Sequence, residues 1–195
     1  MLYLCFKSMV YAQGTLTFDD LSLPFYGQTE PVPNGYGALQ WVNFYAVNPA
    51  NSFQGPSGSG FQNAVVSSDN VIWNGGGNPA GISSSSLFNL YSAYLTADWM
   101  NGLQLDVQGY TGNVLTYDEV YTINTTAPTL LAFDYLGVNQ VTFTASGGTP
   151  VYTSSGSEFA IDNMTVAVPE PSAVSLLLIT GAGIGFFRSI SRRSA

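Results

Sequence analysis

The residues of this chain that could carry out chemistry are its twelve carboxylates, which run from Asp19 to Glu170. The chain contains no histidine, which excludes a histidine-dependent catalytic triad and a histidine-ligated zinc site. A glycoside hydrolase needs only two carboxylates. Asp118 and Glu119 are adjacent, but on a strand they would point to opposite faces of the sheet. We therefore expect a protein that is not an enzyme, with a carboxylate-dependent glycoside hydrolase as a distant alternative.

Three of these acids suggest a cation site. Asp19 and Asp20 lie near the start of the body of the chain, and Asp162 lies near its end. If the first and last strands are neighbours, these oxygen ligands could meet and coordinate Ca²⁺. The alternative is that they face solvent or cap turns. Apart from this possible Ca²⁺, the sequence requires no cofactor.

Flat aromatic side chains beside amides are the residue types that bind sugars. The candidates here are Trp73, Tyr36, Trp41, Trp99 and Asn74. Trp73 is followed by Asn74 and three glycines, a composition typical of a loop, and is therefore the best candidate. Trp41 and Trp99 lie in patterned segments, where large aromatic residues more often fill a core.

The charge distribution limits the partners of the body. Between Ser8 and Phe187 there is no lysine or arginine. A surface that carries only negative charge repels phosphate backbones, so the sequence excludes nucleic acid as a partner. Ion pairs are also impossible within this range, and the fold must depend on apolar burial and neutral hydrogen bonds.

The elements that must position these side chains are short strands. Residues 103–108, 141–145 and 159–162 alternate apolar and polar with a period of two, as half-buried strands do. Further strands are expected at 15–18, 39–44, 64–67, 87–95, 114–123 and 129–133. Turn clusters rich in glycine, proline and asparagine separate them. The pattern predicts an all-β fold with a single β-sandwich domain of the jelly-roll type.

The last 28 residues have a different composition. The uncharged run from Ser172 to Phe187 is 16 residues long and is followed by Arg188, Arg192 and Arg193. This is slightly below the roughly 17 to 25 residues of a usual membrane span, and flanking residues or a thinner bilayer can make up the difference. Arginines after the run predict a cytoplasmic carboxyl terminus and an exported body.

The ordered combination of Val168, Pro169, Glu170 and Pro171 with the apolar run and the arginines resembles the carboxyl-terminal sorting signal of PEP-CTERM proteins. The resemblance implies recognition by an exosortase-type enzyme. It also implies a transient membrane anchor and a location in the cell envelope or extracellular matrix. A plain membrane anchor is the alternative, although such an anchor does not need the Pro-Glu-Pro motif.

Short strings in the body carry a second resemblance. Phe18-Asp19-Asp20-Leu21 and Phe159 to Val166 are similar to exported β-sandwich passengers of PEP-CTERM proteins and to galactose-binding-type jelly rolls. This resemblance implies that the first and last strands lie close together. One sandwich hosts many functions, so it implies a fold more than an activity.

The amino-terminal segment resembles part of a secretory signal peptide. Val10-Tyr11-Ala12 is similar to the small-residue end of such a signal, but Lys7 interrupts the apolar stretch before it. We interpret residues 1–12 as a signal remnant whose true start lies upstream, followed by an exported domain at 13–167 and a sorting region at 168–195. Cys5 is the only cysteine, so the domain cannot form a disulfide.

These observations predict an exported, non-enzymatic carbohydrate- or exopolysaccharide-binding module. A purely structural protein of the cell surface or biofilm matrix is the alternative. A binding module should carry exposed side chains that converge on a ligand, whereas a structural protein should not.

Overall fold

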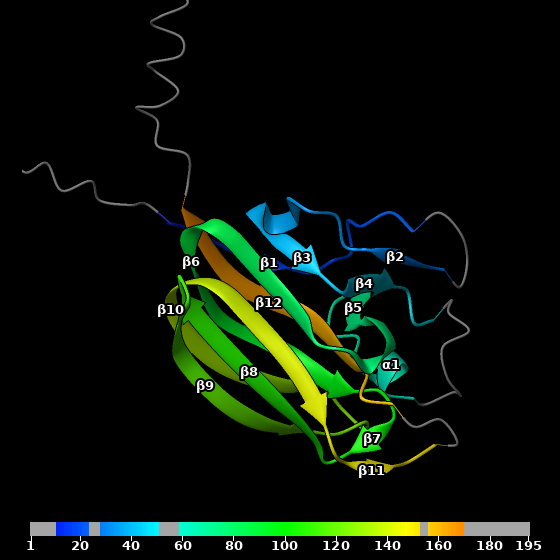
Figure 1. Cartoon of the computed structure of the whole chain (residues 1–195). Helices are drawn as coiled ribbons and strands as arrows, with labels where there is room; N and C mark the ends of the chain where they lie inside the picture. The colour runs from blue at the N-terminus through cyan, green and yellow to red at the C-terminus, as the bar shows by residue number, and fades with distance from the viewer. Residues whose placement is uncertain (1–10, 24–27, 51–58, 153–155, 170–195) are drawn as a thin grey trace, which may run out of the picture. The chain divides into compact units, whose positions relative to one another are not determined.

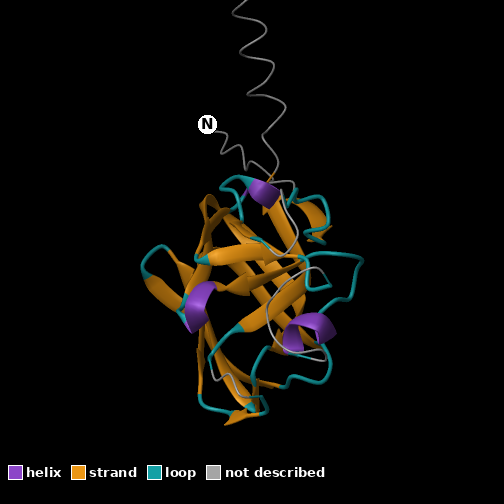
Figure 2. Ribbon diagram, turned by 90° about the vertical axis from the view of Figure 1, so that its right-hand side faces the viewer, coloured by secondary structure: helices purple, strands orange, loops and turns teal. Residues whose placement is uncertain are grey.

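The structure, a computed structural model, describes residues 11–23, 28–50, 59–152 and 156–169. Strands dominate these residues, and the helices are single short turns (Figure 2). The strands are β1 (Tyr11–Leu16), β2 (Thr29–Pro31), β3 (Gln40–Val42), β4 (Phe44–Val47), β5 (Val71–Asn74), β6 (Ala80–Ala97), β7 (Met100–Asn101), β8 (Leu103–Thr111), β9 (Val114–Ile123), β10 (Thr129–Ser146), β11 (Thr149–Pro150) and β12 (Phe159–Pro169). The helical elements are η1 (Tyr36–Ala38), α1 (Gly60–Asn63) and η2 (Gly75–Gly77).

Ten strands form one hydrogen-bonded sheet in the order β2-β4-β5-β12-β6-β10-β8-β9, with β1 beside β12 and β3 beside β6. The sheet folds over itself because β6 and β10 each belong to two layers (Figure 1). The first layer contains β9, β8, the second half of β10, the first half of β6, and β3. The second layer contains the first half of β10, the second half of β6, and then β12, β5, β4 and β2.

Irregularities in β10 allow it to pass from one layer to the other. The β6–β10 register shifts three times between Ala132 and Gln140. Asp134 and Gly137 have positive φ angles of 51° and 68° in this stretch. Bulges of this kind bend a strand and re-aim its side chains. The bend therefore keeps Tyr135 and Val138 in the core even though they are three residues apart.

The core lies between the two layers and consists largely of aromatic rings. Phe143 of the first layer contacts Phe44 and Phe159 of the second, with ring centroids 5.8 and 6.3 Å apart. Tyr117 stacks on Tyr135 at 4.5 Å. The Tyr135 hydroxyl donates a hydrogen bond of 2.8 Å to the carbonyl of Val107. These contacts join the layers without any ion pair, because the described residues contain no lysine or arginine.

The prediction of a mostly β fold is confirmed. The strand expected at 114–123 is β9, and the alternating segment at 103–108 lies within β8. The segments expected at 129–133 and 141–145 are two parts of the single strand β10. The sequence 39–44 is divided into β3 and β4 by Asn43, which has a φ of 57°.

The strand expected at 64–67 is wrong. Ala64 caps α1, and the following residues form a bend. The backbone N–H groups of Val66 and Ser67 donate to the carboxylate of Asp162, at 2.6 and 2.8 Å. Because these donors are already used, the segment cannot join a ladder.

The carboxyl-terminal strand extends further than the sequence predicted. Two prolines at 169 and 171 argue against regular structure, yet β12 includes Val168 and ends at Pro169. The rest of the predicted sorting region, from Glu170 to Ala195, lies outside the described residues, as does most of the predicted signal remnant. Among the described residues, no helix is long and apolar enough to cross a membrane.

Candidate functional site

Tyr36 and Trp41 belong to an aromatic cluster built on Phe18. The Phe18 ring lies 5.7 Å from Tyr36 and 5.9 Å from Trp41. Trp41 is buried, and its indole N–H donates to the carbonyl of Tyr36 at 2.9 Å. The Tyr36 hydroxyl donates to Asp20 at 2.7 Å. Burial together with this hydrogen bond raises the pKa of Tyr36. The Trp41 ring is therefore part of the core, and the Tyr36 ring packs against the edge of the core.

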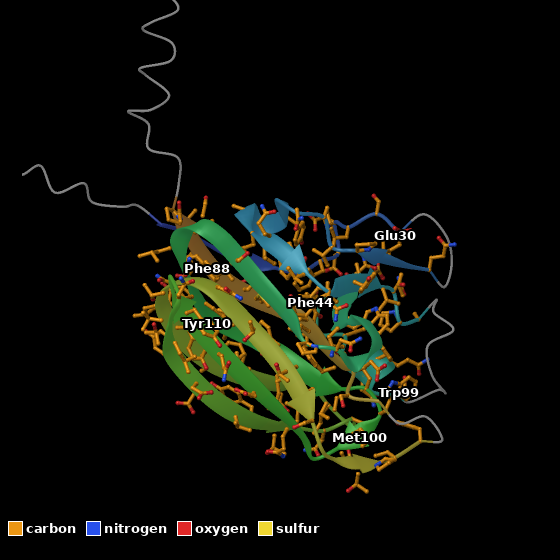
Figure 3. The ribbon with its side chains drawn as sticks, in the orientation of Figure 1. Glu30, Phe44, Phe88, Trp99, Met100 and Tyr110 are labelled. Atoms are coloured by element: carbon orange, nitrogen blue, oxygen red, sulfur yellow. The ribbon has the colours of Figure 1, made fainter. Side chains whose placement is uncertain are left out.

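Trp73 and Trp99 belong to a second cluster around Phe61 of α1. The Phe61 ring lies 5.6 Å from Trp73 and 5.7 Å from Trp99. Trp73 lies within β5, not in a loop, and is partly buried. Trp99 is 7% exposed and lies with Met100 near β7 and β11 (Figure 3). Neither indole ring is presented as a flat exposed platform.

Asn74 is a buried structural residue. Its side-chain oxygen accepts a hydrogen bond from the backbone N–H of Phe159 at 2.8 Å. Its amide nitrogen donates to the carbonyls of Asn78 and Ser157, at 3.0 and 3.3 Å. These bonds join the turn after β5 to the start of β12, so the amide is fully used inside the fold.

Asp19, Asp20 and Asp162 bind different partners. Asp19 accepts from the backbone N–H of Asn70 at 3.0 Å, whereas Asp20 accepts from Tyr36. Asp162 is fully buried and accepts from three backbone N–H groups. Asp19 and Asp162 both hold the bend after α1, so the structure does bring the start and end of the body together. Within the described ranges, no group of three or more Asp, Glu, His or Cys residues could hold a metal ion.

The outward surface of the first layer carries many polar side chains, together with the exposed Val42 and Val120, and we call it the polar face. One row of neighbouring residues crosses five strands in the order Val42, Gly81, Thr142, Gln108 and Asp118. The adjacent row consists of Gln40, Ser83, Gln140 and Tyr110. Their neighbours along each strand point inward and are buried, among them Ile82, Val141 and Val107.

A hydrogen-bonded network occupies the β8–β9 half of the polar face. The Gln108 amide nitrogen donates to Asp118 at 3.2 Å and to Asp106 at 3.4 Å. The Tyr110 hydroxyl donates to the Gln108 amide oxygen at 2.6 Å. Burial raises the pKa of Asp106, and the charge of Asp118 and a hydrogen bond to it raise it further. The two carboxylates are thus held close together on an open face.

A hollow of about 210 Å³ lies on the other half of the polar face. Its lining residues are Val42, Pro79, Ala80, Gly81, Ile82, Ser83, Gln140 and Thr142. Gly81 has no side chain to fill the space, and a Cβ atom there would lie 3.0 Å from the carbonyl oxygen of Val141. The hollow and the network are adjacent, because Thr142 is paired with both Gly81 and Gln108.

The sequence-based search missed the polar face. The signal was present in the alternation of residues 103–108, which places Gln104, Asp106 and Gln108 on the outward side of a strand. The pairing of this strand with β10 and β9 is a long-range contact that local periodicity does not encode. The search therefore favoured the tryptophans, which the fold uses for packing.

No family model matches the sequence, and no curated protein matches it. Among solved structures, the chain is similar to a DUF4465 family protein from Bacteroides ovatus, with 8% identity and a TM-score of 0.45 over 81% of this chain and 99% of that one. It is also similar to CBM51 from Clostridium perfringens GH95, solved with methyl-galactose, with 12% identity and a TM-score of 0.36 over 78% and 99% of the two chains. A third similarity is to the M60 catalytic domain with two CBM51 domains from Clostridium perfringens ZmpB, with 12% identity and a TM-score of 0.39, covering 82% of this chain and 15% of that one.

Proposed function

We propose that this chain is a non-enzymatic polysaccharide-binding protein and that it binds through the polar face. The observation that carries the proposal is the row from Val42 to Asp118, in which the polar side chains of Thr142, Gln108 and Asp118 line up beside a hollow at Val42 and Gly81. Five strands at the usual spacing span roughly 19 Å. That length suits an extended oligosaccharide lying across the strands.

The chemistry of the polar face favours a neutral polysaccharide. Thr142, Gln140 and Gln108 offer hydroxyl and amide groups, which both donate and accept hydrogen bonds as sugar hydroxyls do. Asp106 and Asp118, when ionised, accept hydrogen bonds but cannot donate them. Because the described residues contain no basic side chain, an acidic polysaccharide would be repelled.

Affinity electrophoresis of the full chain in gels containing β-glucan, galactan, mannan or alginate tests the proposal. We expect retardation by at least one neutral polysaccharide and none by alginate, which is acidic. Gln108→Ala and Thr142→Val should each weaken binding by about tenfold, the loss expected for a hydrogen bond.

Gln62→Ala is the matched control, because it removes the same kind of amide from an exposed position on α1. It should bind as well as the parent chain, and circular dichroism should show that all variants are folded. Equal retardation of the parent and both polar-face variants would refute the site. Absence of binding to every neutral polysaccharide would favour the structural-protein alternative.

A glycoside hydrolase is the second candidate, and the Asp106–Asp118 pair is the specific observation in its favour. A raised pKa on one of two neighbouring carboxylates is the arrangement that such enzymes use. The pair lies on an open sheet face, however, and Gln108 bridges it. Release of reducing sugar by the parent chain but not by Asp106→Asn would establish the hydrolase.

We further propose that the protein is exported and sorted through residues 168–195. The Pro-Glu-Pro motif, the apolar run and Arg188, Arg192 and Arg193 support this proposal. It implies an exosortase-type enzyme and a membrane as partners, and a final location in the envelope or matrix. Fractionation of the source cells with mass spectrometry of the mature carboxyl terminus tests it. Intact chain in the cytosol would contradict it.

A further inference from the structure

Five buried oxygen atoms without hydrogen-bond partners belong to residues at the end of β6, just before β12 and just before α1. They are both carboxylate oxygens of Asp98, Oε2 of Glu158, and the hydroxyl oxygens of Ser59 and Thr96. Only three other buried side-chain atoms of the described residues lack a partner. Asp98 is fully buried, Ser59 is 0% exposed and Thr96 is 1% exposed. Buried polar groups normally have hydrogen-bond partners, so these five oxygen atoms without partners require a physical explanation.

The backbone brings these oxygens to one place. Thr96 pairs with Ala160 and Ala97 pairs with Phe159 in the β6–β12 ladder. Asp98 and Glu158 directly follow the last pair of this ladder, and the N–H of Asp98 donates to the carbonyl of Glu158 at 3.0 Å. If the alternation of the ladder continues by one position, the two carboxylates and the Thr96 hydroxyl lie on one face. The charge of Glu158 acts on Asp98, which agrees with this placement.

Ser59 reaches the same place from α1. The N–H of Gly60 donates to the carbonyl of Asp98 at 3.2 Å. A Cβ atom on Gly60 would overlap the carbonyl of Ala97, at 1.8 Å. This close approach sets the backbone at residues 59 and 60 directly against the Asp98 backbone.

The two carboxylates have no compensating charge within the described chain, because those residues include no lysine, arginine or histidine. Burial, and then the charge of Glu158, raise the pKa of Asp98 well above its usual range. A buried carboxylate that faces a second carboxylate is costly unless a cation accompanies it.

We propose that Asp98, Glu158, Ser59 and Thr96 form a Ca²⁺ site at the junction of β6, β12 and α1. Two carboxylates match the charge of a divalent ion. The unpartnered atoms are all hard oxygen ligands, which suit Ca²⁺ and not Zn²⁺. Neighbouring carbonyl groups and water would complete the six to eight ligands that Ca²⁺ takes. This site is separate from Asp19, Asp20 and Asp162, and it does not depend on polysaccharide binding.

Titration of the full chain with Ca²⁺ after treatment with a chelator tests the proposal. We expect the thermal midpoint to rise by about 5 to 10 °C at a Ca²⁺ concentration about 100 times the Kd. Terbium ions should replace Ca²⁺ and luminesce on excitation of tryptophan, because Trp99 directly follows Asp98.

Asp98→Asn and Glu158→Gln should each abolish the Ca²⁺-dependent rise and the terbium luminescence. Asp98→Asn should also raise the midpoint in chelator, since it removes a buried charge that lies beside a second carboxylate. Asp106→Asn, on the polar face, should keep the full response to Ca²⁺. An unchanged midpoint and no luminescence in the parent chain, or an undiminished response in Asp98→Asn and Glu158→Gln, would overturn the site. An equal rise with Mg²⁺ would overturn the choice of Ca²⁺.

Discussion

Asp162 shows how one buried carboxylate holds a segment that is distant in sequence. Its two oxygens accept from the N–H groups of Val66, Ser67 and Asn163 at 2.6 to 2.8 Å, and from the Ser67 hydroxyl at 3.1 Å. The bend after α1 is thereby tied to the centre of β12. Asp162, which the sequence suggested as a calcium ligand, is thus already hydrogen-bonded to backbone N–H groups.

Asp162→Asn should destabilise the protein by about 1 to 3 kcal/mol, the cost of leaving buried donors unpaired. An asparagine replaces one acceptor oxygen with an NH₂ group, so at least one set of N–H donors would face another donor. Urea unfolding measures the change. Asp134→Asn is the control, because Asp134 is exposed and its positive φ suits asparagine. Equal stability of the two variants would contradict the role of Asp162.

The Asp106–Asp118 pair makes a prediction about pKa. The Asp118 charge and its hydrogen bond contribute to the raised pKa of Asp106. Asp118→Asn should therefore lower the pKa of Asp106 toward its ordinary value. A pH titration of the Asp106 carboxyl carbon by NMR measures the shift. Asp69→Asn, at an exposed position in the bend after α1, should leave it unchanged. No change in Asp118→Asn would mean that the two carboxylates do not interact.

At the scale of elements, regular alternation was sufficient to predict β8, whose buried and outward residues alternate along most of its length. The range of β9 was also predicted, although Ile123 is the one buried residue of that strand. Alternation was insufficient for β6 and β10. These 18-residue strands contain bulges and a bend, so their buried residues change phase. As a result, β10 was predicted as two shorter strands and β6 as one shorter strand at 87–95. Local sequence does not indicate which layer each half joins, since that depends on partners far away in the chain.

The candidate site was harder to predict than the fold for a related reason. The tryptophan and asparagine residues suggested contacts with a sugar, because aromatic rings and amides bind sugars. In the structure, however, Trp41, Trp99 and Asn74 are buried. Whether an aromatic ring faces solvent or core is decided by packing between layers. The polar face depends on the register of five strands, which only the tertiary structure reveals.

The packing of α1 against the end of β6 makes a further prediction. Gly60→Ala would place a methyl group within the backbone of Ala97 and Asp98, where neither neighbour can rotate away. We expect a loss of about 1 to 3 kcal/mol, as for other overpacked positions. Gly14→Ala in β1, where no atom lies within 4 Å of the new carbon, is the control. Urea unfolding of both variants compares them, and a neutral effect of Gly60→Ala would show that α1 can shift.

At the scale of the whole molecule, one sign of charge dominates the folded body. All four basic residues lie outside the described ranges, and eleven of the twelve acids lie within them. Charge repulsion therefore opposes folding and no ion pair in the described body offsets it.

Added salt should stabilise the protein. Raising NaCl from about 10 mM to about 150 mM shortens the Debye length from about 30 to about 8 Å and screens this repulsion. We expect the urea midpoint to increase steadily over this range. Tetramethylammonium chloride in place of NaCl should give the same trend if the effect is general screening. A midpoint that falls with salt would mean that attractive charge pairs outweigh the repulsion.

The place of β12 has a mechanical consequence. This strand is hydrogen-bonded to β6 along most of its length, and β5 and β1 lie on its other side. A pull on its carboxyl end at Pro169 would act parallel to the strand. Such tension shears many hydrogen bonds simultaneously, whereas a pull across an edge strand peels them apart one after another. A protein tethered at that end would resist drag from its surroundings without any covalent cross-link.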